Sequence, residues 1–166
     1  MPEFGAHFCC PKRGLDQKKA AYVCGPLTEI APEEREAVKR FYERIADLCQ
    51  EVTGARAFVP HEHYDPIKNA NATPEEVDSA EREQVCQNTS CLIVVALAPS
   101  WGGGIEVEMA NQSGVPVLIL CEKEKLAQRR ISRLLRGNPA VRATLPYATE
   151  DEALSLLGEE LIMLDV

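Results

Sequence analysis

The sequence predicts an α/β fold built on a doubly wound parallel sheet of five strands. Two apolar runs carry this prediction, Cys91–Leu97 and Val115–Leu120, because neither alternates with polar residues and both are short enough for strands buried on two faces. A helical pattern lies between them, so the unit reads strand, glycine-rich turn, helix and parallel strand. The same alternation of strands and helices continues through the chain.

The chain is expected to hold one domain. Residues 1–19 mix proline, glycine and basic residues without a sustained period, which indicates a flexible N-terminal tail. Residues 20–166 show no linker or repeat and are long enough to bury a core. The seven cysteines include no CxxC pair, which favours reduced, buried thiols. Cys9 and Cys10 beside His7 leave a metal site as the alternative.

Composition narrows the function classes. The formal net charge of -8 disfavours binding to nucleic-acid polymers, because their phosphates would be repelled. No apolar stretch reaches membrane-spanning length, and the N-terminus lacks the layout of a secretion signal. We therefore expect a soluble, cytoplasmic protein without a membrane partner, in which a local pocket for a small anion remains open.

The first half of the chain predicts two strands around one helix. Ala20–Cys24 reads as the first and central strand, ending at the turn Gly25-Pro26. A helix begins at Pro32 and ends at Gly54, with apolar residues at three- and four-residue steps between them. Arg56–Val59 is expected to form the second strand. The loop that follows it, from Pro60 to Pro66, should emerge at the carboxyl edge of the sheet.

The second half completes the alternation. Thr73, Pro74 and Glu76 predict a capping box that opens a helix reaching about Asn88. The remaining expected elements are a helix over Gly103–Ser113, a basic helix from about Glu124 to Arg136, a strand over Val141–Pro146 and a helix from Glu150 to about Leu164. The expected strand order is 2-1-3-4-5, as in flavodoxin-like and other Rossmann-like proteins.

A candidate site lies at the turn Pro99–Gly104. Ligands of such sheets bind at the carboxyl ends of the strands, where this turn should be. Glu106 would then lie in the first turn of the next helix, at the mouth of the crevice. Its alternative role is to interact with the dipole of its own helix.

Three stretches in these places carry a family resemblance: Tyr22–Leu27, the segment GGGIEVEMA from Gly102, and Val115–Leu120. Together with Ser132–Gly137, they resemble the nucleoside 2-deoxyribosyltransferase superfamily over roughly residues 20–160. The resemblance is greatest to the members that act as 2'-deoxynucleoside 5'-phosphate N-hydrolases. It implies a soluble enzyme that acts on a nucleoside or nucleotide, needs no metal or other cofactor, and assembles as a homodimer or higher homo-oligomer.

The resemblance implies that Glu106 is the nucleophile and that Tyr22 orients it. Cleaving an N-glycosidic bond builds positive charge on the sugar, which a nearby carboxylate stabilises or traps covalently. For Tyr22 the alternative is an ordinary strand aromatic. Ser100 matches a serine that binds the 5'-phosphate, and neighbouring amides would share that anion. The residues implied in substrate binding are Gly25, Pro26, Leu27, His61, Arg82, Ser100, Trp101, Gly102, Gly103 and Gly104.

Some of these assignments leave alternatives open. His63 is the alternative to His61 as the histidine that contacts the substrate. The two histidines, one residue apart, could also bind a metal, although the sequence offers no third ligand. Trp101 would stack on a base or form a packing or dimer contact. Arg82 stands where the family has an aspartate, although a small shift in helix phase brings Glu81, Glu83 or Asp78 there instead.

The chemistry is therefore predicted as an N-glycosidase. Two alternatives remain beside it. A second base as acceptor would make the protein a deoxyribosyltransferase, since the acceptor depends on how well the pocket excludes water. An arginine paired with Glu106 would instead leave a catalytically silent nucleotide-binding or sensor module.

Overall fold

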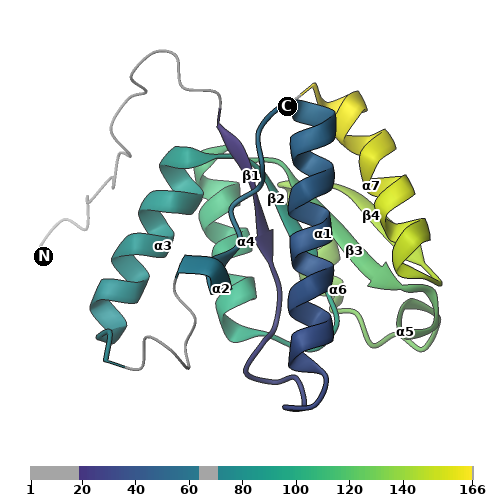
Figure 1. Ribbon diagram of the computed structural model, residues 1–166, viewed down its shortest axis with the longest axis horizontal. Helices are drawn as coiled ribbons and strands as arrows, with labels where there is room; N and C mark the ends of the chain where they lie inside the picture. Colours follow the sequence, from purple (N-terminus) through teal and green to yellow (C-terminus); the bar gives the residue numbers. More distant parts are fainter. Residues whose placement is uncertain (1–18, 64–70, 166) are drawn as a thin grey trace, which may run out of the picture.

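A parallel sheet of four strands forms the middle layer of the protein (Figure 1). The computed structural model describes residues 19–63 and 71–165. The strands are β1 (Ala20–Cys24), β2 (Thr89–Val95), β3 (Val117–Glu122) and β4 (Val141–Tyr147), and they lie in that order. All three strand pairs are parallel. The predicted N-terminal tail, apart from Lys19, lies outside the described residues.

Helices cover both faces of the sheet. α1 (Arg35–Thr53) and α7 (Glu150–Leu164) pack side by side on one face. α3 (Pro74–Asn88) and α4 (Trp101–Ser113) pack together on the other. Three short helices lie in the connections: α2 (Pro60–His63), α5 (Lys123–Ala127) and α6 (Arg133–Arg136). Among the described residues, no helix is both long enough and apolar enough to span a bilayer.

The apolar runs of the sequence form the centre of two cores. Ile93 and Val95 of β2 face α1 and α7, whereas Leu92 and Val94 face α3 and α4. Because successive strand residues point to opposite faces, a strand with helices on both sides needs apolar residues throughout. This arrangement confirms the prediction of strands buried on both faces.

The predicted fifth strand is wrong. Of the segment expected to be the second strand, Phe58 alone forms a bridge to the sheet, opposite Tyr22. Its amide donates to the Ala21 carbonyl at 2.7 Å, and its carbonyl accepts from the Val23 amide at 2.9 Å. The segment does lie on the outer edge of β1, which is the position that the expected strand order gives to the second strand. α2 begins at Pro60, two residues after Phe58, so the backbone pairing with β1 does not continue along the chain.

The prediction of one helix from Glu124 to Arg136 is also wrong, because the structure has two short helices there, α5 and α6. α5 ends at Ala127, and Arg129 adopts a positive φ of 59°, which a continuous right-handed helix does not allow. α6 begins anew after Ser132, whose hydroxyl accepts from the Leu135 amide at 3.3 Å. The hydroxyl cap was the available signal for this second start.

Elsewhere the local signals predict the elements well. Thr73 and Glu76 form the expected capping box at the start of α3. Gly54 and Gly114 end α1 and α4 with left-handed backbone conformations, at φ of 78° and 69°. Part of the predicted loop after Val59 is helical instead, as α2, and residues 64–66 of that prediction lie outside the described residues.

Candidate functional site

α4 begins earlier than expected, and this places the candidate glutamate deeper in the helix. Ser100 caps α4 by accepting a hydrogen bond from the Gly103 amide at 3.1 Å. The glycines of the expected turn therefore form the first helical turn after Trp101. Glu106 lies in the second turn rather than the first. It is only 7% exposed, so its carboxylate is removed from water.

Both oxygens of the Glu106 carboxylate accept hydrogen bonds from β1. The Tyr22 hydroxyl donates to Oε1, and the Cys24 thiol donates to Oε2 at 2.7 Å. Tyr22 and Cys24 are two residues apart on one strand, so their side chains point to the same face of the sheet. This face is the one covered by α4, and the two donors hold the carboxylate from one side.

The protonation states of this cluster follow from its burial. Burial raises the pKa of Glu106 above its ordinary value of 4.5, and the hydrogen bonds from Cys24 and Tyr22 oppose that rise. Burial, followed by the charge of Glu106, raises the pKa of both the Tyr22 phenol and the Cys24 thiol. Both groups therefore keep their protons at neutral pH and act as donors.

A second carboxyl group lies close to this cluster. Burial, followed by the charges of Glu106 and Asp78, raises the pKa of Glu81 on α3 to about 7. Both carboxyl groups therefore have raised pKa values, as ionisable groups at functional sites often do. Glu81 is thus the carboxyl group of α3 that interacts electrostatically with Glu106, and it is not among the cavity-lining residues.

A cavity of about 730 Å³ adjoins the cluster at the carboxyl ends of β1 and β2. Cys24 lines this cavity and also bonds to Glu106, which links the two features. A methyl group at position 103 would lie 3.2 Å from the Cys24 sulfur, so the glycine allows α4 to approach β1 closely. The predicted site residues on the cavity wall are Gly25, Pro26, Ser100, Trp101, Gly103 and Gly104.

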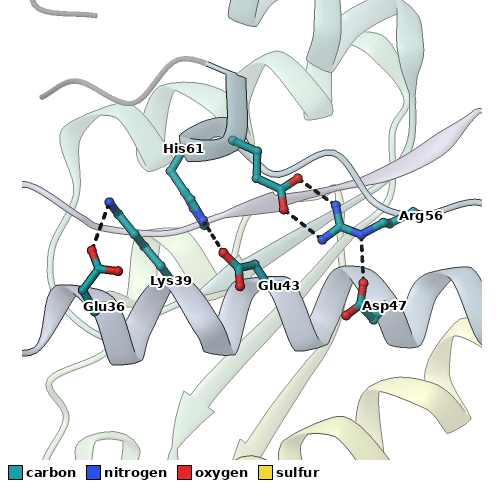
Figure 2. Close-up of polar contacts among 7 residues, drawn as sticks. Glu36, Lys39, Glu43, Asp47, Arg56 and His61 are labelled. Carbon is teal, nitrogen blue, oxygen red and sulfur yellow. Dashed lines mark hydrogen bonds and ion pairs between the residues drawn. The ribbon is translucent and has the colours of Figure 1, made fainter. Parts of the chain in front are cut away.

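Other predicted residues are not on the cavity wall. Tyr22 and Glu106 belong to the hydrogen-bonded cluster and are not among the lining residues. Figure 2 shows His61 pointing toward α1, where its Nε2 lies 3.2 Å from Oε1 of Glu43. Arg82 pairs with Asp78, one helical turn earlier, at 2.9 Å. Leu27 packs at the edge of the core beneath α1. A methyl group at position 102 would meet no atom within 4 Å, and Gly102 is not among the cavity-lining residues.

An ion-pair network beside His61 fixes the segment that carries the Phe58 bridge. Arg56 donates to Asp47 of α1 at 2.8 Å, as Figure 2 shows. It also forms two hydrogen bonds with Glu62 of α2. The network therefore attaches α2 and the preceding segment to the outer surface of α1.

Sequence reasoning missed several residues around the site. Cys24 gave no signal, because a cysteine in an apolar run reads as a small hydrophobic residue. Phe58, also missed, stacks on Tyr22 with ring centroids 5.4 Å apart. His63, the alternative to His61, stacks on Phe58 at 4.4 Å. Arg130, Ser132 and Asn138 add polar groups to the cavity wall. Of these three residues, Ser132 alone belonged to a segment that the sequence had singled out, Ser132–Gly137.

Fold and site together define a Rossmann-like α/β protein. It has a buried glutamate, whose carboxylate accepts two hydrogen bonds, beside a cavity at the carboxyl edge of the sheet. Neither a protein-family model nor a curated protein sequence matches the chain. Solved structures do resemble it. A CMP N-glycosidase from Clostridium botulinum, BcmB, is 22% identical with a TM-score of 0.56, over 84% of this chain and 99% of that one.

Two further structures share the same architecture. BlsM, solved in solution, has a TM-score of 0.66 at 18% identity, over 88% of this chain and 91% of that one. A conserved protein from Enterococcus faecalis V583 has a TM-score of 0.59 at 17% identity, over 87% of this chain and all of that one. At such identities the likenesses establish a common fold.

Proposed function

We propose that this protein is an N-glycosidase of the nucleoside 2-deoxyribosyltransferase-like group, which cleaves the bond between base and sugar in a nucleoside or nucleoside 5'-monophosphate. The single observation that carries the proposal is the buried Glu106 carboxylate, held through both oxygens by Tyr22 and Cys24. Burying a carboxylate is costly even when hydrogen bonds offset part of the cost, and carboxyl groups with perturbed pKa values gather at functional sites. The name of the structurally similar CMP N-glycosidase supports the same chemistry.

The proposed reaction has two steps. A carboxylate oxygen of Glu106 attacks the anomeric carbon, the bond to the base nitrogen breaks, and its electron pair leaves with the base. Glu81 donates a proton to the departing base. Water then attacks the same carbon, releases the Glu106 carboxylate and returns a proton to Glu81.

Burial raises the pKa of both carboxyl groups, and hydrogen bonds from Cys24 and Tyr22 oppose that rise at Glu106, which supports this division of roles. Activity requires an ionised Glu106, so it is lost as the pH falls through the pKa of that group. Activity also requires a protonated Glu81, so it is lost as the pH rises past about 7. A bell-shaped pH profile with its alkaline limb near neutrality is therefore expected.

The cavity supports a nucleotide-sized substrate. Ser100 and the amides of the first turn of α4 would hold the 5' end, because helix N-termini bind anions. Arg130 and Lys125 add positive charge to the cavity wall, which also carries Glu29 and Glu108. Trp101, 92% exposed at the cavity rim, offers an aromatic surface for a base or for a neighbouring subunit.

A silent sensor is less well supported. That alternative was based on an arginine that pairs with the nucleophile, but the Arg82 guanidinium pairs with Asp78. The carboxyl group whose pKa responds to Glu106 is Glu81. Transfer to a second base stays an alternative outcome of the same chemistry, decided by which acceptor reaches the glycosyl intermediate.

A homo-oligomer belongs to the same proposal. Trp101 and Leu134 line the cavity and are 92% and 87% exposed, and Ile105 follows Trp101 by one helical turn at 55%. Large apolar side chains grouped at a cavity rim are typical of protein contacts. A second copy of the chain would cover them and close the cavity.

The test is release of free base, measured by chromatography. The panel contains ribo- and deoxyribonucleosides and their 5'-monophosphates, with and without an added second base. Glu106→Ala should abolish release, whereas Glu83→Ala, on the exposed side of α3, should leave it unchanged. A folded wild-type protein that binds nucleotides but releases no base from any of them would overturn the proposal in favour of the sensor.

A further inference from the structure

The Cys24 thiol occupies a special place in the molecule. It is the last residue of β1 and is 1% exposed. Its sulfur lies 2.7 Å from Oε2 of Glu106, and the residue also forms part of the cavity wall. Tyr22 makes the matching contact to Oε1 but is not among the cavity-lining residues. Glu106 itself is not among the lining residues either, so Cys24 is the residue that joins the cavity wall to the carboxylate.

The two donors differ in strength. A phenol is a full hydrogen-bond donor, whereas a thiol is a weak one. Oε1 is thus held firmly by Tyr22, while Oε2 receives a weaker bond that draws away less of its electron density. An oxygen that must attack carbon gains from a partner that orients it without competing strongly for its lone pairs.

We infer that Cys24 is a positioning residue for the reaction, and that its thiol presents Oε2 of Glu106 as the attacking oxygen on the cavity side. This inference rests on the proposed function. It gives Cys24 a role beyond filling the core. Gly103 contributes by leaving room for the sulfur, since a methyl group there would lie 3.2 Å from it.

The thiol also favours the ionised form of Glu106. In the described part of the chain, the titratable groups around the carboxylate are Tyr22 and Cys24 from β1 and Glu81 from α3. The hydrogen bond from Cys24 lowers the pKa of Glu106 against the effect of burial. Removing it leaves Tyr22 as the remaining donor and lets burial raise the pKa further.

The experiment titrates Glu106 directly by carbon NMR of the side-chain carboxyl group, assigned with Glu106→Gln. In Cys24→Ala the pKa of Glu106 should rise by about one unit, a tenfold change in its ionisation constant. In Cys24→Ser, whose hydroxyl restores a donor, the pKa should return to the wild-type value or below. Should Cys24→Ala not fold, Cys24→Val takes its place, since valine fills the volume without a donor.

Cys91→Ala is the matched control. Cys91 is an equally buried thiol on the neighbouring strand, but its side chain belongs to the core on the opposite face of the sheet. It should lose stability without moving the pKa of Glu106. Activity provides the second measurement: the acid limb of base release should move to higher pH in Cys24→Ala and not in Cys91→Ala or Cys24→Ser.

The outcomes separate the two proposals, because the titration needs no substrate. An unchanged pKa of Glu106 in Cys24→Ala or Cys24→Val overturns the role of Cys24 even if the wild type releases base. A shifted pKa in a protein that releases no base overturns the proposed reaction, and with it the positioning role. A shifted pKa together with a shifted acid limb supports both.

Discussion

Gly25 and Tyr42 approach one another so closely that a methyl group at position 25 would lie 2.2 Å from the Tyr42 hydroxyl oxygen. That hydroxyl donates to the Pro26 carbonyl at 2.9 Å, so the contact fixes the turn that leaves β1. The turn lines the cavity one residue after Cys24. Glycine is therefore required here by space rather than by backbone dihedrals.

Gly25→Ala should destabilise the protein by about 1–3 kcal/mol, because the turn or the Tyr42 ring has to move. Gly104→Ala is the control, since a methyl group there meets no atom within 4 Å and alanine favours a helix interior. It should stabilise by roughly 0.5–1 kcal/mol. Urea unfolding of both variants measures the difference. Equal stability of the two variants would contradict the contact.

Tyr22→Phe should lower kcat by about 10- to 100-fold, because that factor corresponds to the free energy of one hydrogen bond to a charged group. The pKa of Glu106 should rise, so the acid limb of the pH profile moves to higher pH. The fold should persist, because the ring can still stack on Phe58. Steady-state base release across pH, beside a thermal unfolding curve, provides the measurement. A wild-type acid limb would show that the phenol does not support the carboxylate.

Glu81→Gln should flatten the pH dependence of stability. The pKa of Glu81 is raised in the folded protein to about 7, so its contribution to stability is fully present below pH 4.5 and is lost as the pH rises toward and past 7. Over that range the wild type should lose on the order of 1–3 kcal/mol more than the variant. Urea unfolding at pH 5 and pH 8 measures it, with Glu83→Gln as control. The same loss in Glu81→Gln as in the wild type would remove Glu81 as the cause.

Trp101→Lys combined with Leu134→Lys should dissociate the proposed homo-oligomer. Both side chains are almost fully exposed at the cavity rim, so the lysines cost the isolated chain little, whereas a charge buried between two copies is expensive. Sedimentation velocity of wild type and variant distinguishes the states. Ile162→Lys, at an exposed site on α7, should leave the assembly intact. A wild type that sediments as a monomer would contradict this part of the proposal.

Much of the fold was predictable because its signals are local. The capping box at Thr73 and the glycines after α1 and α4 each act within one turn of helix. The bridge at Phe58 was harder to foresee, because the short segment Arg56–Val59 has strand character whether or not α2 begins at Pro60. The break in the predicted basic helix rests on the single positive φ of Arg129, for which the sequence carries no strong marker.

The candidate site was predictable in its parts but not in its contacts. Tyr22 and Glu106 are 84 residues apart, and their pairing depends on how α4 lies against β1. The helix phase that selects Glu81 rather than Arg82 is likewise a result of packing between α3 and α4. Cys24 escaped notice because the pattern of a buried strand cannot distinguish a thiol that fills space from one that bonds.

The bridge at Phe58 has a consequence for the lifetime of the site. Two backbone hydrogen bonds hold this segment to β1, and the Phe58 ring covers the face of Tyr22. Opening the segment therefore uncovers the phenol that supports Glu106 while the four strands stay paired. Hydrogen exchange at the Phe58 amide would then report how often the assembled site comes apart in the native protein, at a free energy below that of global unfolding.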